Sequence, residues 1–152
     1  MRIANGAPMA EKLKILFLCT GNSCRSQMAE GWTRHLKNDV IEPYSAGVEI
    51  HGLNERAVYV MKEAGVAISD HYSKNVRDLL HIPFDWVITV CDHANETCPV
   101  FPGNVKRYHL SFSDPPRLAA DAKTEEEALL HYRRVRDEIR VFVEKLPGIL
   151  ER

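Results

Sequence analysis

The chain lacks two features that would place it in large classes of proteins: a long apolar run and an excess of charge of one sign. No segment approaches the roughly 20 apolar residues that span a bilayer. The 20 basic and 21 acidic side chains give a formal net charge of −1. There is therefore no overall basic field to attract nucleic acid or an anionic membrane, and any anion must bind at a local site.

The sequence also lacks an export signal. The apolar segment Leu13–Leu18 is too short for a signal peptide, and Lys14 interrupts it. A chain of 152 residues can fold around a core without disulfides. We therefore expect a cytoplasmic protein whose four cysteines serve catalysis or metal binding. We expect one domain at residues 13–150, preceded by a disordered extension at residues 1–12.

Apolar runs that are typical of buried strands alternate with segments of helical periodicity. The expected strands are Lys14–Cys19, Ile41–Ala46, Trp86–Cys91 and Val105–Leu110, and the expected helices are Cys24–Lys37, Asn54–Ala64, Ser73–Leu80 and Thr124–Leu146. This order predicts an α/β domain: a single open, four-stranded parallel sheet with helices on both faces, flavodoxin-like. Ligands bind beyond the carboxyl ends of such strands, where Cys19 and Cys91 would share one edge.

The motif CTGNSCRS, residues 19–26, follows the first strand and leads into a helix. Such a loop binds anions through its backbone amides and the positive end of the helix, so we expect an oxyanion to be held by Thr20, Gly21, Asn22, Ser23 and Cys24. Arg25 can hold two oxygens of a tetrahedral anion. Cys19 is the nucleophile, Ser26 can hydrogen-bond its sulfur, and the positive potential should lower its pKa.

A proton donor is the next requirement of such a site. Asp114 lies in the motif SDPP, where two prolines would stiffen the loop that presents it. We expect Asp114 to protonate a leaving oxygen. Asp92 and His93 are the competing candidates.

The segment CDHANETC places Cys91 and Cys98 after the third expected strand. Three interpretations remain open from the residues alone. The two thiols can be inert, they can bind zinc with His93, or they can pass an oxidation outward from Cys19 by thiol–disulfide exchange. The polar interior of this segment, DHANET, predicts a helix-poor, mobile loop.

From about Lys14 to Lys145 the chain resembles the low-molecular-weight protein tyrosine phosphatase superfamily, and within it the thioredoxin-coupled arsenate reductases. The matching motifs, in order, are CTGNSCRSQMAEGW, YSAGVEIHG, VITVC-x₆-CP, SDPP and YRRVRDEI. Phosphatases of the superfamily usually have a proline where this chain has Gln27, and they generally lack the pair Cys91 and Cys98.

The resemblance implies a mechanism. Cys19 attacks arsenate held by the loop and Arg25, Asp114 protonates the departing hydroxyl, and Cys91 then attacks Cys19 so that arsenite leaves. Cys98 attacks Cys91, and thioredoxin reduces the resulting disulfide. Phosphate and sulfate would compete with arsenate, weak phosphatase activity is expected, and Cys24 is left to packing.

The resemblance also implies a candidate cation site, because many relatives bind potassium beside this loop. Asn22, Glu30 and Ser45 match its ligands, whereas Lys74 occupies the position of an aspartate. A lysine ammonium there can replace the metal. We therefore expect activity without potassium and no resident metal or other cofactor.

Two other functions remain as alternatives to arsenate reduction. A phosphatase acting on phosphotyrosine or a small phosphoester needs Cys19, Arg25 and Asp114 but neither Cys91 nor Cys98. A redox sensor or anion-binding module would use the thiols as a switch, would show no turnover with excess thioredoxin, and would not need Asp114.

Overall fold

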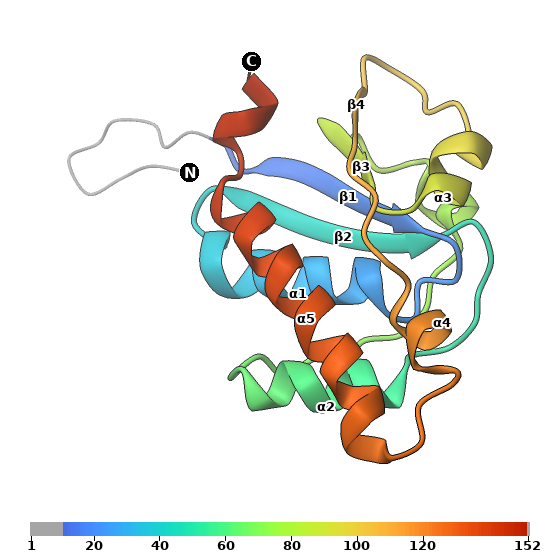
Figure 1. The fold of residues 1–152 in the computed structure, drawn as a ribbon. Coiled ribbons are helices and arrows are strands. Elements are labelled where there is room, and N and C mark those ends of the chain that lie inside the picture. Colours follow the sequence, from blue (N-terminus) through green and yellow to red (C-terminus); the bar gives the residue numbers. More distant parts are fainter. Residues whose placement is uncertain (1–10, 152) are drawn as a thin grey trace.

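Four parallel strands form the predicted sheet in a computed structural model that describes residues 11–151 (Figure 1). Their order is β2-β1-β3-β4, with β1 at Leu13–Cys19, β2 at Ile41–Gly47, β3 at Trp86–Thr89 and β4 at Lys106–His109. The four-stranded parallel sheet expected from the sequence is confirmed. Of the predicted extension at residues 1–12, all but the last two residues lie outside the described part of the chain.

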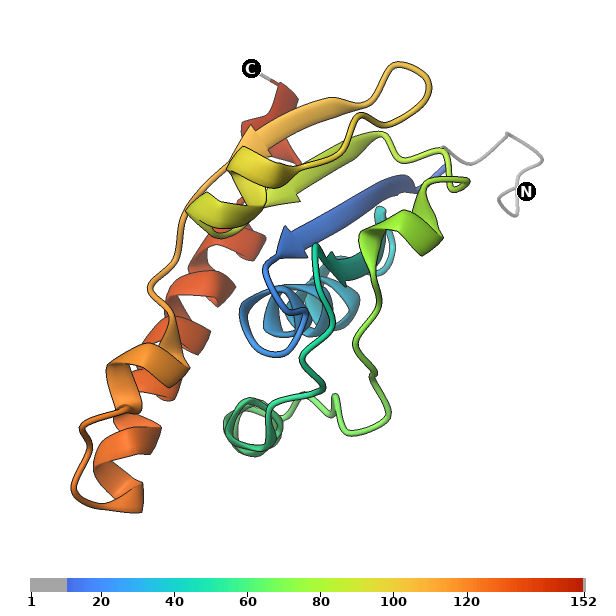
Figure 2. The same cartoon turned by 90° about the vertical axis from the view of Figure 1, so that its right-hand side faces the viewer.

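Helices cover the sheet, and three of them lie in the predicted segments 24–37, 54–64 and 124–146. The helices are α1 (Arg25–Lys37), α2 (Glu55–Glu63), α3 (Asp92–Thr97), α4 (Pro115–Ala119) and α5 (Glu125–Glu144), with 3₁₀ turns η1 (Val76–Leu79) and η2 (Gly148–Glu151). Helices α1 and α5 pack against each other on one face, and Figure 2 shows η1 on the other side of β1 from α5. All four residues 15–18 are fully buried, as a strand covered on both faces requires.

Three segments differ from their predictions. Segment 73–80 forms only the 3₁₀ turn η1, because the Asn75 side chain caps Arg77 N–H and a single residue, Val76, is buried. Segment 92–97, predicted as a helix-poor loop, is the helix α3, and Ala94 is its one buried residue. The SDPP loop continues directly into α4, since Pro115 and Pro116 fill first-turn positions whose N–H groups would have no helical acceptor. Among residues 11–151, no helix combines the length and apolarity that a bilayer crossing requires.

The carboxyl edge of the sheet positions both central thiols. Strands β1 and β3 are neighbours in parallel register, with Leu18 opposite Thr89. Cys19 ends β1, and Cys91 follows β3 by two residues, so the expectation that they share one edge is confirmed. Strand β2 ends there as well, with Gly47 opposite Cys19.

Gly47 allows the loop after β1 to lie against the end of β2. A Cβ atom at this position would lie 2.4 Å from Glu49 O and 2.7 Å from both Asn22 N and Thr20 O. These are backbone atoms, which cannot rotate away as a side chain can. We expect Gly47→Ala to destabilise the fold by about 1 to 3 kcal/mol, measured by urea unfolding.

Gly148→Ala is the matched control, because a Cβ there meets no atom within 4 Å. We expect that control to change the free energy of unfolding by less than about 0.5 kcal/mol. Equal effects of the two substitutions would contradict the close approach at Gly47.

Candidate active site

The loop after β1 closes around a cavity of about 310 Å³ at the carboxyl edge of the sheet. Its lining residues come from three segments: Cys19, Thr20, Gly21, Ser23, Cys24 and Arg25 from the loop after β1, then His51, then Asp114 and Pro116. The structure thus brings together the predicted nucleophile, arginine and acid. Of the five loop residues predicted to bind an oxyanion, Asn22 is not among the lining residues.

Backbone hydrogen bonds orient the loop. Four of its carbonyls, at residues 19, 20, 21 and 23, accept hydrogen bonds of 2.9 to 3.2 Å from the N–H groups of residues 48, 49, 51 and 54. Within the described part of the chain, none of the amides of residues 20–24 donates to a backbone carbonyl. The carbonyls are therefore directed into the protein while the amides remain free to bind an anion, as an anion-binding nest requires.

Asn22 positions the loop instead of lining the cavity. It is fully buried and has a φ of 49°, in the left-handed region that asparagine tolerates better than most residues. Its Oδ1 accepts hydrogen bonds from Lys74 N at 2.8 Å and from Gln27 Nε2 at 3.1 Å. Gln27, at the position where phosphatases usually have proline, also donates to Tyr72 O at 2.9 Å. This network holds the loop at Asn22 in its left-handed conformation.

The Cys19 sulfur lies 2.8 Å from Ser26 Oγ. Because Asn22 Nδ2 donates to the same hydroxyl oxygen at 2.8 Å, the serine proton is free to point toward the sulfur. Burial nevertheless raises the pKa of Cys19, outweighing the hydrogen bonds from the Ser26 side chain and backbone and the charge of Arg25, all of which lower it. The predicted lowering of the Cys19 pKa is therefore wrong, because this residue is only 3% exposed.

Arg25 and Asp114 face each other across the cavity. Arg25 Nη1 donates to Phe112 O at 3.0 Å, and its Nη2 lies 3.8 Å from Asp114 Oδ1. Asp114 is the residue before α4 and makes no capping bond with its side chain, so its carboxyl group can face Arg25 and the cavity. The competing acids Asp92 and His93 belong to α3 and do not line this cavity.

Cys91 and Cys98 lie at the two ends of α3. Cys91 is buried, its sulfur accepts a hydrogen bond from Ala94 N at 3.4 Å, and Thr20 Oγ1 lies 3.3 Å from it. Cys98 is half-buried at the far end, where burial raises its pKa and Arg107 acts in the opposite direction. All four thiols are free.

The zinc alternative does not fit this arrangement. Cys91, His93 and Cys98 do not form a metal-binding group, and no cluster of three His, Cys, Asp or Glu side chains lies close enough to hold a metal within residues 11–151. Cys91 and Cys98 flank the six-residue helix and are seven positions apart, which places their Cα atoms about 10 Å from each other.

The candidate cation site holds a buried carboxylate between two cations. Glu30 accepts hydrogen bonds from Ser45 Oγ at 2.5 Å and from Arg34 Nη1 at 2.7 Å, and Lys74 Nζ lies 4.0 Å from its Oε1. Lys74 also donates to Tyr72 O at 2.8 Å. Burial lowers the pKa of Lys74, and the charge of Glu30 partly opposes this effect.

Sequence reasoning missed His51, which lines the cavity. Its ring packs so closely on the loop that a Cβ on Gly21 would lie 2.3 Å from His51 Nδ1. The ring nitrogen Nε2 lies 2.6 Å from Glu49 Oε2. Because His51 follows the second strand in a segment without helical or strand periodicity, only its place in the motif YSAGVEIHG marked it.

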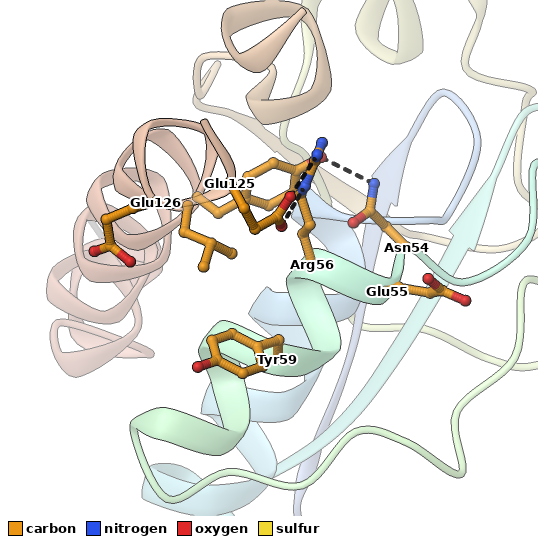
Figure 3. Close-up of a pocket in the computed structure, with 8 residues that line it drawn as sticks. Asn54, Glu55, Arg56, Tyr59, Glu125 and Glu126 are labelled. Carbon is orange, nitrogen blue, oxygen red and sulfur yellow. Dashed lines mark hydrogen bonds and ion pairs between the residues drawn. The ribbon is translucent and has the colours of Figure 1, made fainter. Parts of the chain in front are cut away.

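A larger hollow of about 770 Å³ lies between α2 and the start of α5 (Figure 3). Figure 3 shows Arg56 directed at Glu125, which accepts two hydrogen bonds from it at 2.9 and 3.0 Å, and Tyr59 standing apart from this pair. This hollow contains no thiol and its guanidinium is already paired. The chemistry therefore belongs to the smaller cavity around Cys19.

Comparisons with known proteins agree with this geometry. Residues 14–152 match the low molecular weight phosphotyrosine protein phosphatase family. The chain belongs to this family. Arsenate reductase of Shouchella clausii is 48% identical over 141 residues, which are 90% of this chain and 96% of that protein. Arsenate reductase of Bacillus subtilis is 50% identical over 125 residues, which are 82% and 88% of the two chains.

A solved structure agrees as well. An arsenate reductase in the phosphate binding state superimposes with a TM-score of 0.67 at 28% identity, covering 88% of this chain and 95% of that chain. The resemblance to the arsenate reductases of the phosphatase family, and the family's fold, are thus confirmed.

The hydrogen bonds at Cys19 make a testable prediction about its ionisation. Ser26 stabilises the thiolate, so Ser26→Ala should raise the pKa of Cys19 further. The pH profile of Cys19 alkylation by iodoacetamide, followed by mass spectrometry of the loop peptide, should move to higher pH and the rate at neutral pH should fall. Ser23→Ala, which changes a cavity residue with no bond to the sulfur, is the control. An unchanged or lower pKa in Ser26→Ala would show that this bond has no electrostatic effect.

Proposed function

We propose that this phosphatase-family chain is a cytoplasmic arsenate reductase whose thiols pass the oxidation outward to thioredoxin. The observation that carries the proposal is the order of three thiols, two at the carboxyl edge of the sheet and the third at the far end of α3. Cys19 lines the oxyanion cavity, Cys91 lies within hydrogen-bond distance of the next loop residue, Thr20, and Cys98 lies at the outer end of α3. Relatives named arsenate reductases that span nearly the whole chain support this assignment.

The first step forms a bond between Cys19 and arsenic. The loop amides and Arg25 hold arsenate, and the Cys19 thiolate attacks arsenic(V). One oxygen leaves as water after Asp114 supplies a proton. The 3.8 Å between Arg25 and Asp114 supports this division of labour, since the arginine can bind the oxyanion beside the acid that protonates its leaving group.

The second step reduces arsenic. The Cys91 thiolate attacks the Cys19 sulfur, the sulfur–arsenic bond breaks, and its electron pair stays on arsenic, which leaves as arsenite. The hydroxyl of Thr20, 3.3 Å from the Cys91 sulfur, is placed to donate a hydrogen bond that favours the attacking thiolate. A disulfide between Cys19 and Cys91 remains.

The third step returns Cys19 to its thiolate form. Cys98 attacks Cys91, the Cys19 sulfur leaves, and thioredoxin then supplies two electrons and two protons to the disulfide between Cys91 and Cys98. A disulfide requires Cα atoms within roughly 4.4–6.8 Å, whereas an intact α3 holds these two about 10 Å apart. Helix α3 must therefore unwind during this step.

Phosphoester hydrolysis is the second candidate activity. It requires only Cys19, Arg25 and Asp114, which share one cavity. We propose it as a weak side reaction, because nothing in such hydrolysis would employ Cys91 and Cys98.

We also propose that the Lys74 ammonium takes the place of potassium. It lies 4.0 Å from the buried carboxylate of Glu30, and the Lys74 backbone amide is bound to Asn22 of the loop. A fixed positive charge at this point neutralises Glu30 and supports Asn22 without a metal ion.

The relay predicts a clear phenotype for Cys98→Ala. With arsenate, thioredoxin, thioredoxin reductase and NADPH, the wild type should consume NADPH continuously. The variant should release at most one arsenite per molecule, because it lacks the Cys98 thiol that attacks Cys91 and frees Cys19. Hydrolysis of p-nitrophenyl phosphate, which needs only the cavity around Cys19, should persist in the variant. Continuous arsenate-dependent NADPH consumption by Cys98→Ala would rule out the relay.

The lysine replacement predicts a rate that does not depend on potassium. The initial rate of arsenate reduction should change little when KCl replaces NaCl at equal ionic strength. Lys74→Asp should make the rate rise with KCl, since the carboxylate restores a cation ligand and removes the ammonium. A several-fold stimulation of the wild type by potassium would contradict the proposal.

A further inference from the structure

Helix α3 is too short to be stable alone, so other contacts must hold it. A helix of six residues is far below the roughly 12–15 residues at which isolated helices become marginally stable. Its backbone cap is a sulfur acceptor, Cys91 Sγ, 3.4 Å from Ala94 N, and sulfur is a weak acceptor. Apart from the buried Ala94, the residues of this helix are all exposed.

A histidine from the adjacent strand connects this helix to the sheet. His109, the last residue of β4, has its Nε2 3.0 Å from Asp92 Oδ1 in the first turn of α3. Its Nδ1 lies 2.7 Å from Thr89 Oγ1, at the end of β3. Thr89 Oγ1 in turn lies 3.3 Å from Asn95 Oδ1, one turn further along α3.

These contacts form one connected network. The imidazole ring of His109 bonds to Asp92 through Nε2 and to Thr89 through Nδ1 at the same time. The Thr89 hydroxyl extends the network to Asn95. His109 therefore joins two turns of α3 to the ends of β3 and β4.

We propose that His109 is a positioning residue that, through Asp92 and Thr89, fastens the first turns of α3 and so keeps Cys91 and Cys98 apart. This inference rests on the proposed relay, in which the two thiols must meet. The fastening stabilises the reduced helix and is broken when the disulfide forms. Removing it should therefore favour the disulfide over the two thiols.

The test uses the full chain with Cys19→Ser and Cys24→Ser, which leaves Cys91 and Cys98 as its only thiols. In a glutathione buffer the two thiols give two electrons and two protons to glutathione disulfide, forming one protein disulfide and two glutathione molecules. Alkylation and mass measurement then give the equilibrium constant. No arsenate is involved, so the readout is independent of the catalytic activity.

We expect Asp92→Asn and His109→Ala each to raise this equilibrium constant about two- to fivefold, the range of solvent-exposed side-chain pairs. The double variant should show no more than the larger single effect, because both substitutions break the same contact. Asp92→Glu should recover most of the wild-type value. Amide hydrogen exchange should become faster in α3 and remain unchanged in α5.

The matched control is Glu96→Gln, which removes the same charge from the same helix. Glu96 is exposed and makes no ion pair or hydrogen bond within residues 11–151. If Asp92→Asn behaves like Glu96→Gln, or if the two single effects add in the double variant, the fastening is wrong while the relay stands. If no variant forms a disulfide between Cys91 and Cys98, the relay and the fastening are both wrong.

Discussion

The orientation of one peptide loop is the constraint on which the rest of the site depends. Backbone amides of the segment after β2 bind the carbonyls of residues 19, 20, 21 and 23, and this fixes which side of the loop presents N–H groups. A tetrahedral anion needs several donors converging on one point, and preorganised backbone amides supply them without reorganisation. This arrangement requires two special residues. Gly47 lets the backbone of the loop contact the backbone after β2, and Asn22 adopts the left-handed conformation that turns the loop.

Burial of the nucleophile follows from the same loop and acts against its ionisation. The sulfur of Cys19 must lie at the floor of the nest to reach an atom held by the amides, and there it loses water. Ser26 and Arg25 oppose that loss but do not outweigh it. The sequence-based prediction of a lowered Cys19 pKa took into account the helix N-terminus and Arg25, because the motif itself contains them. It omitted desolvation, which depends on how the segment after β2 covers the loop.

Features that depend on local sequence were predicted, and features that depend on tertiary packing were not. Continuous apolar runs located β1 and β3, and their adjacency placed Cys19 and Cys91 together, because parallel strands expose their carboxyl ends at one edge. Local motifs located Arg25 and Asp114. Contacts that arise only from tertiary packing were missed: His51 approaches Gly21 from a segment without periodicity, and His109 reaches α3 from another strand.

Helix α3 shows why such tertiary contacts cannot be predicted from the local sequence pattern. DHANET has a single buried residue and no apolar stripe, so its composition favours a loop. The helix forms because Cys91 caps it and His109 binds its first turn. A helix held by so few contacts requires little free energy to unwind. The relay needs that property, since a firmly packed helix would keep Cys98 about 10 Å from its partner, and a disordered segment would not keep Cys91 beside Thr20 before the reaction.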